Sequence, residues 1–148
     1  MTILERIRQD HDTLRTLLAK AEKEQGKSAF EQLQRELWAH AKAEETIFYA
    51  ALNRAKTARM ETVEGLNEHH MINNLVDELN AMPAEGVSWR AKLQVLGELV
   101  RHHLDEEEEE MFEEAEKLLD KKRSTELGDL YLDRKEHALA ALEPLPKG

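Results

Sequence analysis

Histidine and glutamate recur in this chain at spacings that suit metal binding. A histidine precedes a glutamate by four residues twice, at His40–Glu44 and at His103–Glu107. Residues four apart lie one turn apart on the same face of a helix, so each pair is able to hold one metal centre. Two further histidines, His11 and His69, stand among apolar residues at helical spacing. Because the chain has no cysteine, the ligands on offer are imidazole and carboxylate, which suit iron, manganese or zinc.

The helices that carry these residues are marked by apolar side chains that repeat every three or four residues. Capping boxes at Thr2–Glu5 and Ser28–Glu31 mark the starts of the first two helices. The expected helices end near Gly26, near Ala55, at the turn 82–86 and near Leu119, with the fourth beginning near Ser88. We predict an all-α fold: an antiparallel up-down-up-down four-helix bundle over about 2–121, with an additional short C-terminal helix over about 125–142, in a single domain 1–148.

Each of the four long helices carries one histidine in the register of its core residues. Polar side chains on such a stripe are costly to bury unless a partner satisfies them. In the third helix His69 is the expected inward residue, because the register through His70 would also turn Asn73 and Asp77 inward. His70 stays as the alternative ligand. The apolar residues expected to face inward include Leu14, Phe30, Leu33, Leu37, Leu66, Ile72, Val76, Val100, Leu127 and Leu130.

The predicted turns also place these side chains at one level of the bundle. In an antiparallel pair of helices, residues at the same level lie equally far from the turn that joins them. His11 and the middle of 40–44 flank the turn near Gly26, and His69 and the middle of 103–107 flank the turn at 82–86. All six side chains should therefore converge. If both glutamates bridge a pair of metal ions, two histidines remain for each ion, and an open position is left for a small molecule.

Composition excludes several other classes of function. The formal net charge of −10 argues against nucleic acid or an anionic membrane as a partner. No run approaches the ~18 apolar residues of a membrane span, and the first residues lack the apolar core of a signal peptide, so we expect a cytoplasmic protein. We also expect it to be a monomer or a weak homodimer. The acidic run Asp105–Glu110, apart from Glu107, is expected to be solvated surface, as are His102 and His137. Glu45 is expected to orient one of the ligand histidines.

The order of these residues resembles that of the hemerythrin-like, or HHE cation-binding, family. The resemblance covers about residues 5–115 and rests on His11, HAKAE at 40–44, EHH at 68–70 and HLDEE at 103–107. It implies a four-helix bundle around two non-haem iron ions with an oxo or hydroxo bridge, manganese or zinc being alternatives. It also implies a small-molecule ligand, O2, NO or H2O2, and a role in oxidative or nitrosative stress. The ligands implied are His11, His40, Glu44, His69, His103 and Glu107.

This chain departs from the family pattern at several positions, and these differences change what we expect of its function and of two of its helices. Oxygen-carrying members have a second histidine where this chain has Asn73, and HxxxxD where it has His103–Glu107, which argues against reversible oxygen carriage. Many members have proline where Ala50 and Glu113 stand, so the second and fourth helices should continue without a kink. The alternative functions are an iron sensor, a reservoir or an iron–sulfur repair-type protein that handles iron without turnover of its own, and a structural zinc site.

Overall fold

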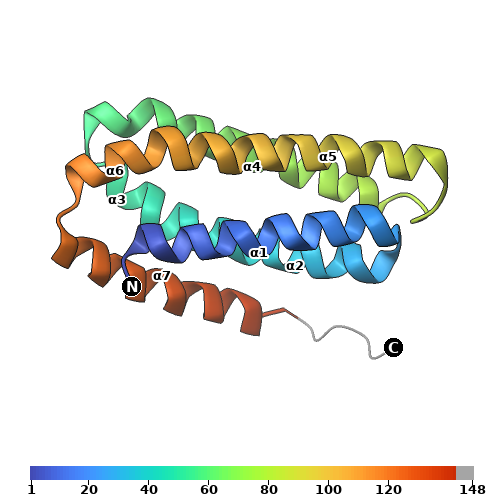
Figure 1. Ribbon diagram of the computed structural model, residues 1–148, viewed down its shortest axis with the longest axis horizontal. Helices are drawn as coiled ribbons and strands as arrows, with labels where there is room; N and C mark the ends of the chain where they lie inside the picture. The colour runs from blue at the N-terminus through green and yellow to red at the C-terminus, as the bar shows by residue number, and fades with distance from the viewer. Residues whose placement is uncertain (143–148) are drawn as a thin grey trace.

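The computed structural model describes residues 1–142, except the side chain of Lys56, and every regular element in this range is helical (Figure 1). The elements are α1 (Ile3–Glu24), α2 (Lys27–Ala43), η1 (Glu44–Tyr49), α3 (Ala50–Leu52), η2 (Lys56–Ala58), α4 (Arg59–Asn80), α5 (Gly86–Glu106), η3 (Glu107–Met111), α6 (Phe112–Leu118) and α7 (Lys121–Ala140). Because α2–η1–α3 and α5–η3–α6 each form one continuous rod, the chain builds four long helices and a fifth, as predicted from the sequence.

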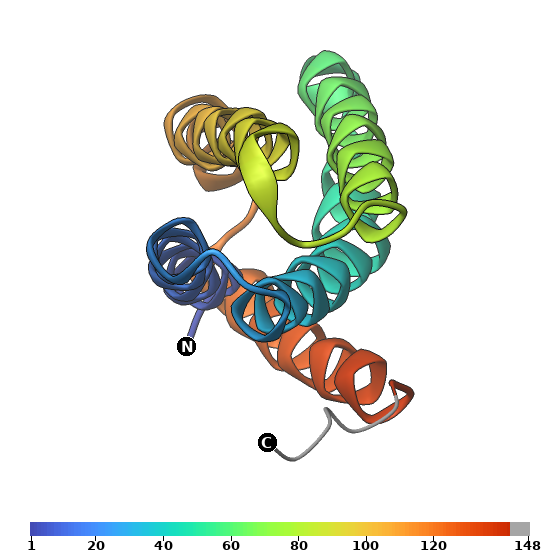
Figure 2. The ribbon, with the colours of Figure 1, turned by 90° about the vertical axis from the view of Figure 1, so that its right-hand side faces the viewer.

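The four rods form a bundle, and α7 lies outside it. α1 packs against α2 and α5, and α4 packs against α5, in the bundle seen end-on in Figure 2. α7 packs against both α1 and α2. Within residues 1–142, no helix combines the length and the apolar character that crossing a membrane requires.

Side-chain caps mark the starts of α1 and α7, and the sequence correctly predicted the cap of α1. The capping box of α1 is formed, with the Glu5 amide 3.3 Å from Thr2 Oγ1 and the Thr2 amide 3.1 Å from Glu5 Oε1. The second predicted box is wrong, because extended Gly26 precedes α2 and Ser28 lies inside its first turn. The predicted range 125–142 for the last helix is also wrong. α7 begins at Lys121, where the Asp120 carboxylate accepts a hydrogen bond from the Arg123 amide at 2.7 Å.

Two apolar clusters fill the bundle, one on each side of the predicted metal-binding residues. The first, near the α1–α2 and α4–α5 turns, includes Leu14, Leu18, Leu33, Trp89, Leu93 and Val100. The second, near the opposite end, includes Ile3, Ile7, Phe48, Phe112, Leu127 and Tyr131. Burying a large apolar side chain stabilises a fold by about 1.5–3 kcal/mol, so the clusters hold the polar layer between them.

Two of the predicted core residues lie on the surface instead. Leu66 is 43% exposed and Leu130 is 48% exposed. In α4 the inward register passes through Gly65 and His69, which leaves Leu66 on the outer side. In α7 the inward positions belong to Leu127 and Tyr131.

The second and fourth rods contain a turn of π-helix that the sequence pattern did not predict. Both rods do continue past Ala50 and Glu113, but their π-helical turns begin at Glu44 and at Glu107. Such turns insert an extra residue and are common at functional sites. In η1 the wider turn brings the Tyr49 hydroxyl within 2.8 Å of Glu44 Oε1, five residues earlier.

Candidate metal centre

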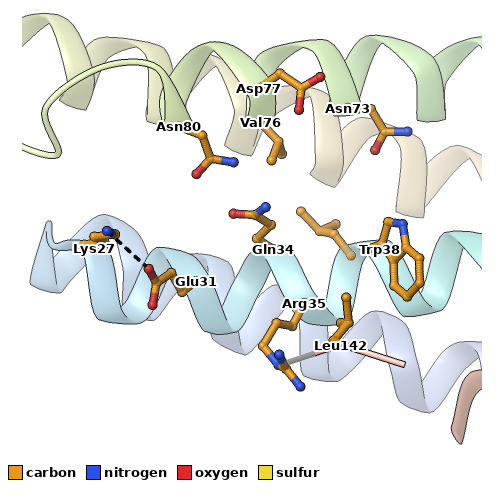
Figure 3. A pocket seen from close by; sticks show the side chains of 11 residues that line it. Lys27, Glu31, Gln34, Arg35, Trp38, Asn73, Val76, Asp77, Asn80 and Leu142 are labelled. Carbon is orange, nitrogen blue, oxygen red and sulfur yellow. Dashed lines mark ion pairs between the residues drawn. The ribbon is translucent and has the colours of Figure 1, made fainter. Parts of the chain in front are cut away.

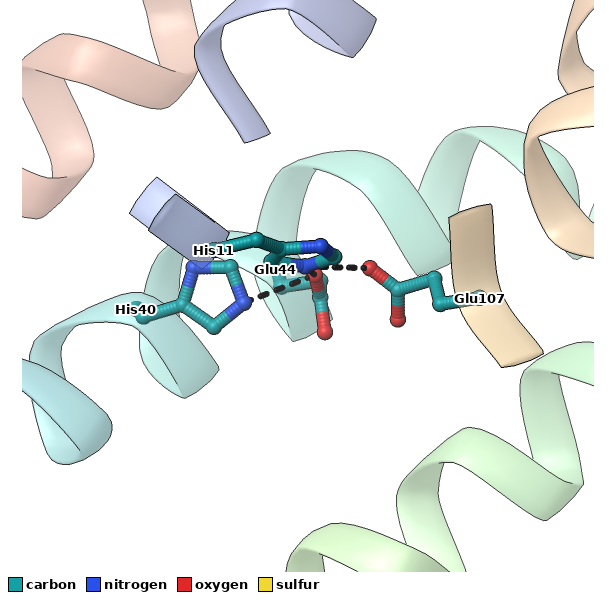
Figure 4. A group of neighbouring side chains, drawn as sticks. All are labelled: His11, His40, Glu44 and Glu107. Carbon is teal, nitrogen blue, oxygen red and sulfur yellow. Dashed lines mark ion pairs between the residues drawn. The ribbon is translucent and has the colours of Figure 1, made fainter. Parts of the chain in front are cut away.

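The structure brings all six predicted side chains into one buried layer between the two apolar clusters. Each of them is at most 5% exposed, and they come from all four rods: His11, His40, Glu44, His69, His103 and Glu107. Figure 4 shows how His11, His40 and Glu107 gather around Glu44. The alternative residue, His70, is exposed, as are His102 and His137. The third helix therefore contributes His69 to the layer.

Glu44 lies between two pairs of histidines and turns one oxygen toward each pair. Its Oε2 lies 2.9 Å from His40 Nε2 and 3.8 Å from His11 Nε2. Its Oε1 lies 3.0 Å from His69 Nε2 and 3.7 Å from His103 Nε2. The sequence left open which histidines lie together, and the geometry pairs His11 with His40 and His69 with His103.

Glu107 spans the same two histidine pairs from the opposite rod. Its Oε1 lies 3.3 Å from His11 Nε2, and its Oε2 lies 3.5 Å from His103 Nε2. Like Glu44, it thus offers one oxygen to each pair. Two carboxylates arranged in this way suit a site that holds two metal ions side by side.

The inner nitrogen and oxygen atoms of this layer lack hydrogen-bond partners. They are Nε2 of all four histidines, Oε2 of Glu44 and Oε1 of Glu107, all buried. A buried polar atom without a partner costs about 1–3 kcal/mol, so several of them converging on one place require an explanation. Metal ions would satisfy them, and the donor set of imidazole and carboxylate fits such ions. The residues present therefore fit a metal site.

The outer nitrogen of each histidine faces a carboxylate from a different rod. The Nδ1-to-oxygen distances are 2.9 Å for His11–Glu108, 3.2 Å for His40–Asp10, 2.9 Å for His69–Glu45 and 2.7 Å for His103–Glu68. Because an ionised carboxylate only accepts hydrogen bonds, Nδ1–H donates in each case, and Nε2 is left facing the centre. Partners of this kind fix the orientation of metal-binding histidines.

The sequence predicted one of these four acids and misplaced another. Glu45 was expected to orient a histidine, and it lies beside His69. Glu108 was expected on the solvated surface, but its side chain is 16% exposed and contacts His11 and Arg15. Asp10 and Glu68 were not singled out, although each directly precedes a predicted ligand in the chain. That adjacency was the available signal.

Two tyrosines also contact the centre, and neither of them was predicted to lie beside the metal-binding residues. The Tyr49 hydroxyl lies 2.8 Å from Glu44 Oε1 and 2.6 Å from Glu107 Oε2, on the His69 side, and its ring stacks on that histidine. Tyr131 of α7 donates to Asp10, and its oxygen lies 2.6 Å from His40 Nδ1. The C-terminal helix therefore supports the His40 side of the layer.

The electrostatics of the layer favour protonated histidines when no metal ion is bound. Burial lowers the pKa of His11, but the neighbouring carboxylates of Glu107, Glu108 and Glu44 outweigh burial and raise the pKa to about 11. The same balance raises the pKa of His103 to about 10, through Glu44 and Glu68. Burial and the nearby Glu44 carboxylate raise the pKa of Glu107. Metal ions would have to displace these protons, since imidazole binds metal only in its neutral form.

Small cavities adjoin the layer, and a larger groove lies outside it. A cavity of about 10 Å³, room for about one water molecule, is lined by His40, His69, His103 and mostly apolar side chains. The surface groove in Figure 3, about 780 Å³, runs between α2 and α4 and includes Trp38 and Asp77. None of the six predicted ligands lines this groove.

Comparisons with known proteins agree with this architecture. The family model described as hemerythrin HHE cation binding domain matches residues 2–115. A crystal structure of a hemerythrin HHE cation binding domain-containing protein from Mycobacterium kansasii, an Rv2633c homologue, aligns with a TM-score of 0.82. That alignment covers 95% of this chain and 89% of the other at 19% identity, and so shows a shared fold. No curated protein sequence matches the chain. Given the match over residues 2–115, the chain belongs to the hemerythrin HHE cation binding domain family.

Proposed function

We propose that this protein holds two non-haem iron ions and that the pair reacts with a small molecule, O2, NO or H2O2. His11 and His40 would bind one ion, His69 and His103 the other, and Glu44 and Glu107 would bridge them. The observation that carries the proposal is the convergence of six buried, unpaired nitrogen and oxygen atoms, with one oxygen of each glutamate turned toward each histidine pair. Manganese or zinc would suit the same donors.

The protein's own residues favour small-molecule chemistry over a closed structural site. When bound, iron would supply Lewis acidity and redox capacity. The cavity of about 10 Å³ beside His40, His69 and His103 has room for one small molecule, and the rest of its lining is mostly apolar. The Tyr49 hydroxyl supplies a proton donor within hydrogen-bonding distance of both glutamates.

Metal stoichiometry tests the first half of the proposal. Anaerobic titration of the metal-free protein with ferrous ion should reach two ions per chain. The double variant Glu44→Gln/Glu107→Gln removes the bridging charges and should fall below two. The matched control Glu109→Gln/Glu113→Gln changes the same charge at exposed positions and should keep both ions. Two ions retained in the Glu44/Glu107 variant would refute the bridging assignment.

Optical spectroscopy tests the second half. The ferrous protein, loaded with two ions, should change its absorption spectrum or turn over when mixed with at least one of O2, NO and H2O2. A loaded protein that stays silent with all three would contradict reactivity. If that silent protein also lost stability on metal removal, it would instead fit an iron sensor or reservoir.

A further inference from the structure

A second small cavity reaches the metal centre from the acidic side of the bundle. It lies between α4 and the α5–η3 rod and measures about 10 Å³. Its inner wall includes His103 and Glu107 of the proposed centre. Its outer wall carries five further carboxylates: Glu61, Glu64, Glu68, Glu106 and Glu110. Unlike the cavity beside His40, this one is therefore lined mainly by negative charge.

Three residues that line this cavity, His103, Glu107 and Glu61, each hold a buried atom without a hydrogen-bond partner. His103 Nε2 and Glu107 Oε1 are two of the unpaired atoms of the centre, and both residues are 3% exposed. Glu61 Oε2 is likewise buried without a hydrogen bond. An acidic patch alone is ordinary protein surface, but two of the proposed metal ligands, His103 and Glu107, also line this cavity.

The outer carboxylates form groups with the spacing of cation ligands. One oxygen each from Glu64, Glu106 and Glu110 lie within 4.8 Å of one another. Glu68, His102 and Glu106 form a second group of the same kind. Glu106 belongs to both groups, so they are continuous across the surface.

Glu68 connects these outer groups to the buried centre. Its Oε2 lies 3.7 Å from His102 Nε2, which is itself 2.7 Å from Glu106 Oε2. Its Oε1 lies 2.7 Å from Nδ1 of the buried His103. One side chain thus faces the exposed groups and a proposed metal ligand at the same time.

The side chains that pair with the carboxylates of this region are the histidines His102 and His103. Among the described side chains, no lysine or arginine forms an ion pair with any of these five carboxylates, whereas Arg8 and Arg15 neutralise Glu108 of the same acidic run. The carboxylates lie close enough together to affect Glu64. Its pKa is raised by partial burial and by the neighbouring Glu106, Glu68 and Glu61 carboxylates. A concentration of one charge sign raises the local concentration of counter-ions and their rate of association.

We propose that this acidic cavity is the entrance through which divalent cations reach the metal centre, with the Glu64–Glu106–Glu110 group as their first binding point. The inference rests on the proposed two-metal centre. It gives a function to Glu106 and Glu110 of the acidic run, which would attract the cation together with Glu64 and pass it inward by way of Glu68 to His103 and Glu107. Neutral molecules gain nothing from this route, and the apolar cavity beside His40 suits them better.

The rate of metal uptake tests this entrance without any measurement of activity. Metal-free protein is mixed with a small excess of Fe²⁺ under anaerobic conditions, and uptake is followed by stopped-flow absorption. The triple variant Glu64→Gln/Glu106→Gln/Glu110→Gln should take up metal about tenfold more slowly at low ionic strength, at the lower end of the range for electrostatic steering. The difference should shrink at ~1 M salt, where the Debye length falls to about 3 Å. The final stoichiometry should stay at two.

A matched control separates an entrance from a general effect of net charge. The variant Glu109→Gln/Glu113→Gln/Glu116→Gln removes the same charge from exposed positions that do not line the cavity. It should take up metal at nearly the wild-type rate. Equal rates of metal uptake in wild type and both variants, or equal slowing in both variants, would refute the proposed entrance. A wild-type protein that fails to bind two ions at all would instead refute the two-metal centre, so the two failures are distinguishable.

Discussion

Gly65 makes room for the Tyr49 hydroxyl, and replacing it with alanine tests how tightly this part of the centre is packed. A Cβ at position 65 would lie 2.5 Å from the Tyr49 hydroxyl oxygen and 2.7 Å from the ring carbon that bears it. Both distances are shorter than any ordinary contact, so Tyr49 must move in the Gly65→Ala variant. Its hydroxyl would then leave Glu44 and Glu107.

The expected cost follows from two opposing effects. Losing a hydrogen bond between a hydroxyl and a buried carboxylate costs about 1.5–3 kcal/mol. Replacing glycine with alanine inside a helix contributes about 1 kcal/mol in the other direction. The metal-free Gly65→Ala protein should therefore be less stable than wild type by about 0.5–2 kcal/mol, before any strain from the displaced ring is counted.

Urea unfolding of the metal-free protein, followed by circular dichroism, measures this difference. A second background provides the control, since Tyr49→Leu removes the ring carbons and hydroxyl that the new Cβ would meet. In that background Gly65→Ala should stabilise the fold by about 0.5–1 kcal/mol, because only the helix preference remains. A Gly65→Ala protein that is as stable as wild type, or that loses the same free energy in both backgrounds, would refute the reasoning.

Three further outcomes follow from the surroundings of the histidines. Tyr131→Phe removes a partner of His40, so it should weaken the binding of one of the two metal ions roughly tenfold, as measured by calorimetry. His137→Ala changes an exposed residue and should leave the affinities for both ions unchanged. Metal binding at pH 7 should release protons, because the raised pKa values of His11 and His103 favour their protonated forms in the metal-free fold. The release would be measured as a dependence of the binding enthalpy on the buffer. The raised pKa values of these histidines stabilise the metal-free fold, and this stabilisation is complete below 6.5, the pKa of histidine in the unfolded chain. It is lost as the pH rises through the folded-state pKa values of about 9 to 11. In that pH range the melting temperature of the metal-free protein should therefore fall more than that of the two-metal protein.

The helices and the inward histidines could be predicted because both follow from a periodic pattern. An apolar repeat fixes which face of a helix is buried, and the turns fix the level at which residues of neighbouring helices meet. His11 and His69 lie in that repeat, so their burial was predictable one helix at a time. Leu66 was misplaced because Gly65, which carries no side chain to mark a register, occupies the inward position.

The acids and tyrosines around the histidines could not be predicted because they act between helices. Asp10 lies beside a core position, where the apolar pattern gives no signal, and its partners are His40, Tyr131 and Lys135 on other helices. Glu108 looked like one member of a solvated run, and only the packing of α1 against the α5–η3 rod shows that it meets His11. Contacts of this kind depend on the rotation of one helix relative to the next.

These contacts between helices close a ring around the bundle. The first rod supplies Asp10 to a histidine of the second, the second supplies Glu45 to the third, the third supplies Glu68 to the fourth, and the fourth supplies Glu108 back to His11 of the first. Each acid stands next in sequence to a proposed metal ligand, so the rotation that turns a ligand inward also turns its neighbour toward the adjacent rod. The orientation of all four histidines is therefore set by the packing of the helices. Metal binding at the centre should in turn hold the four rods together.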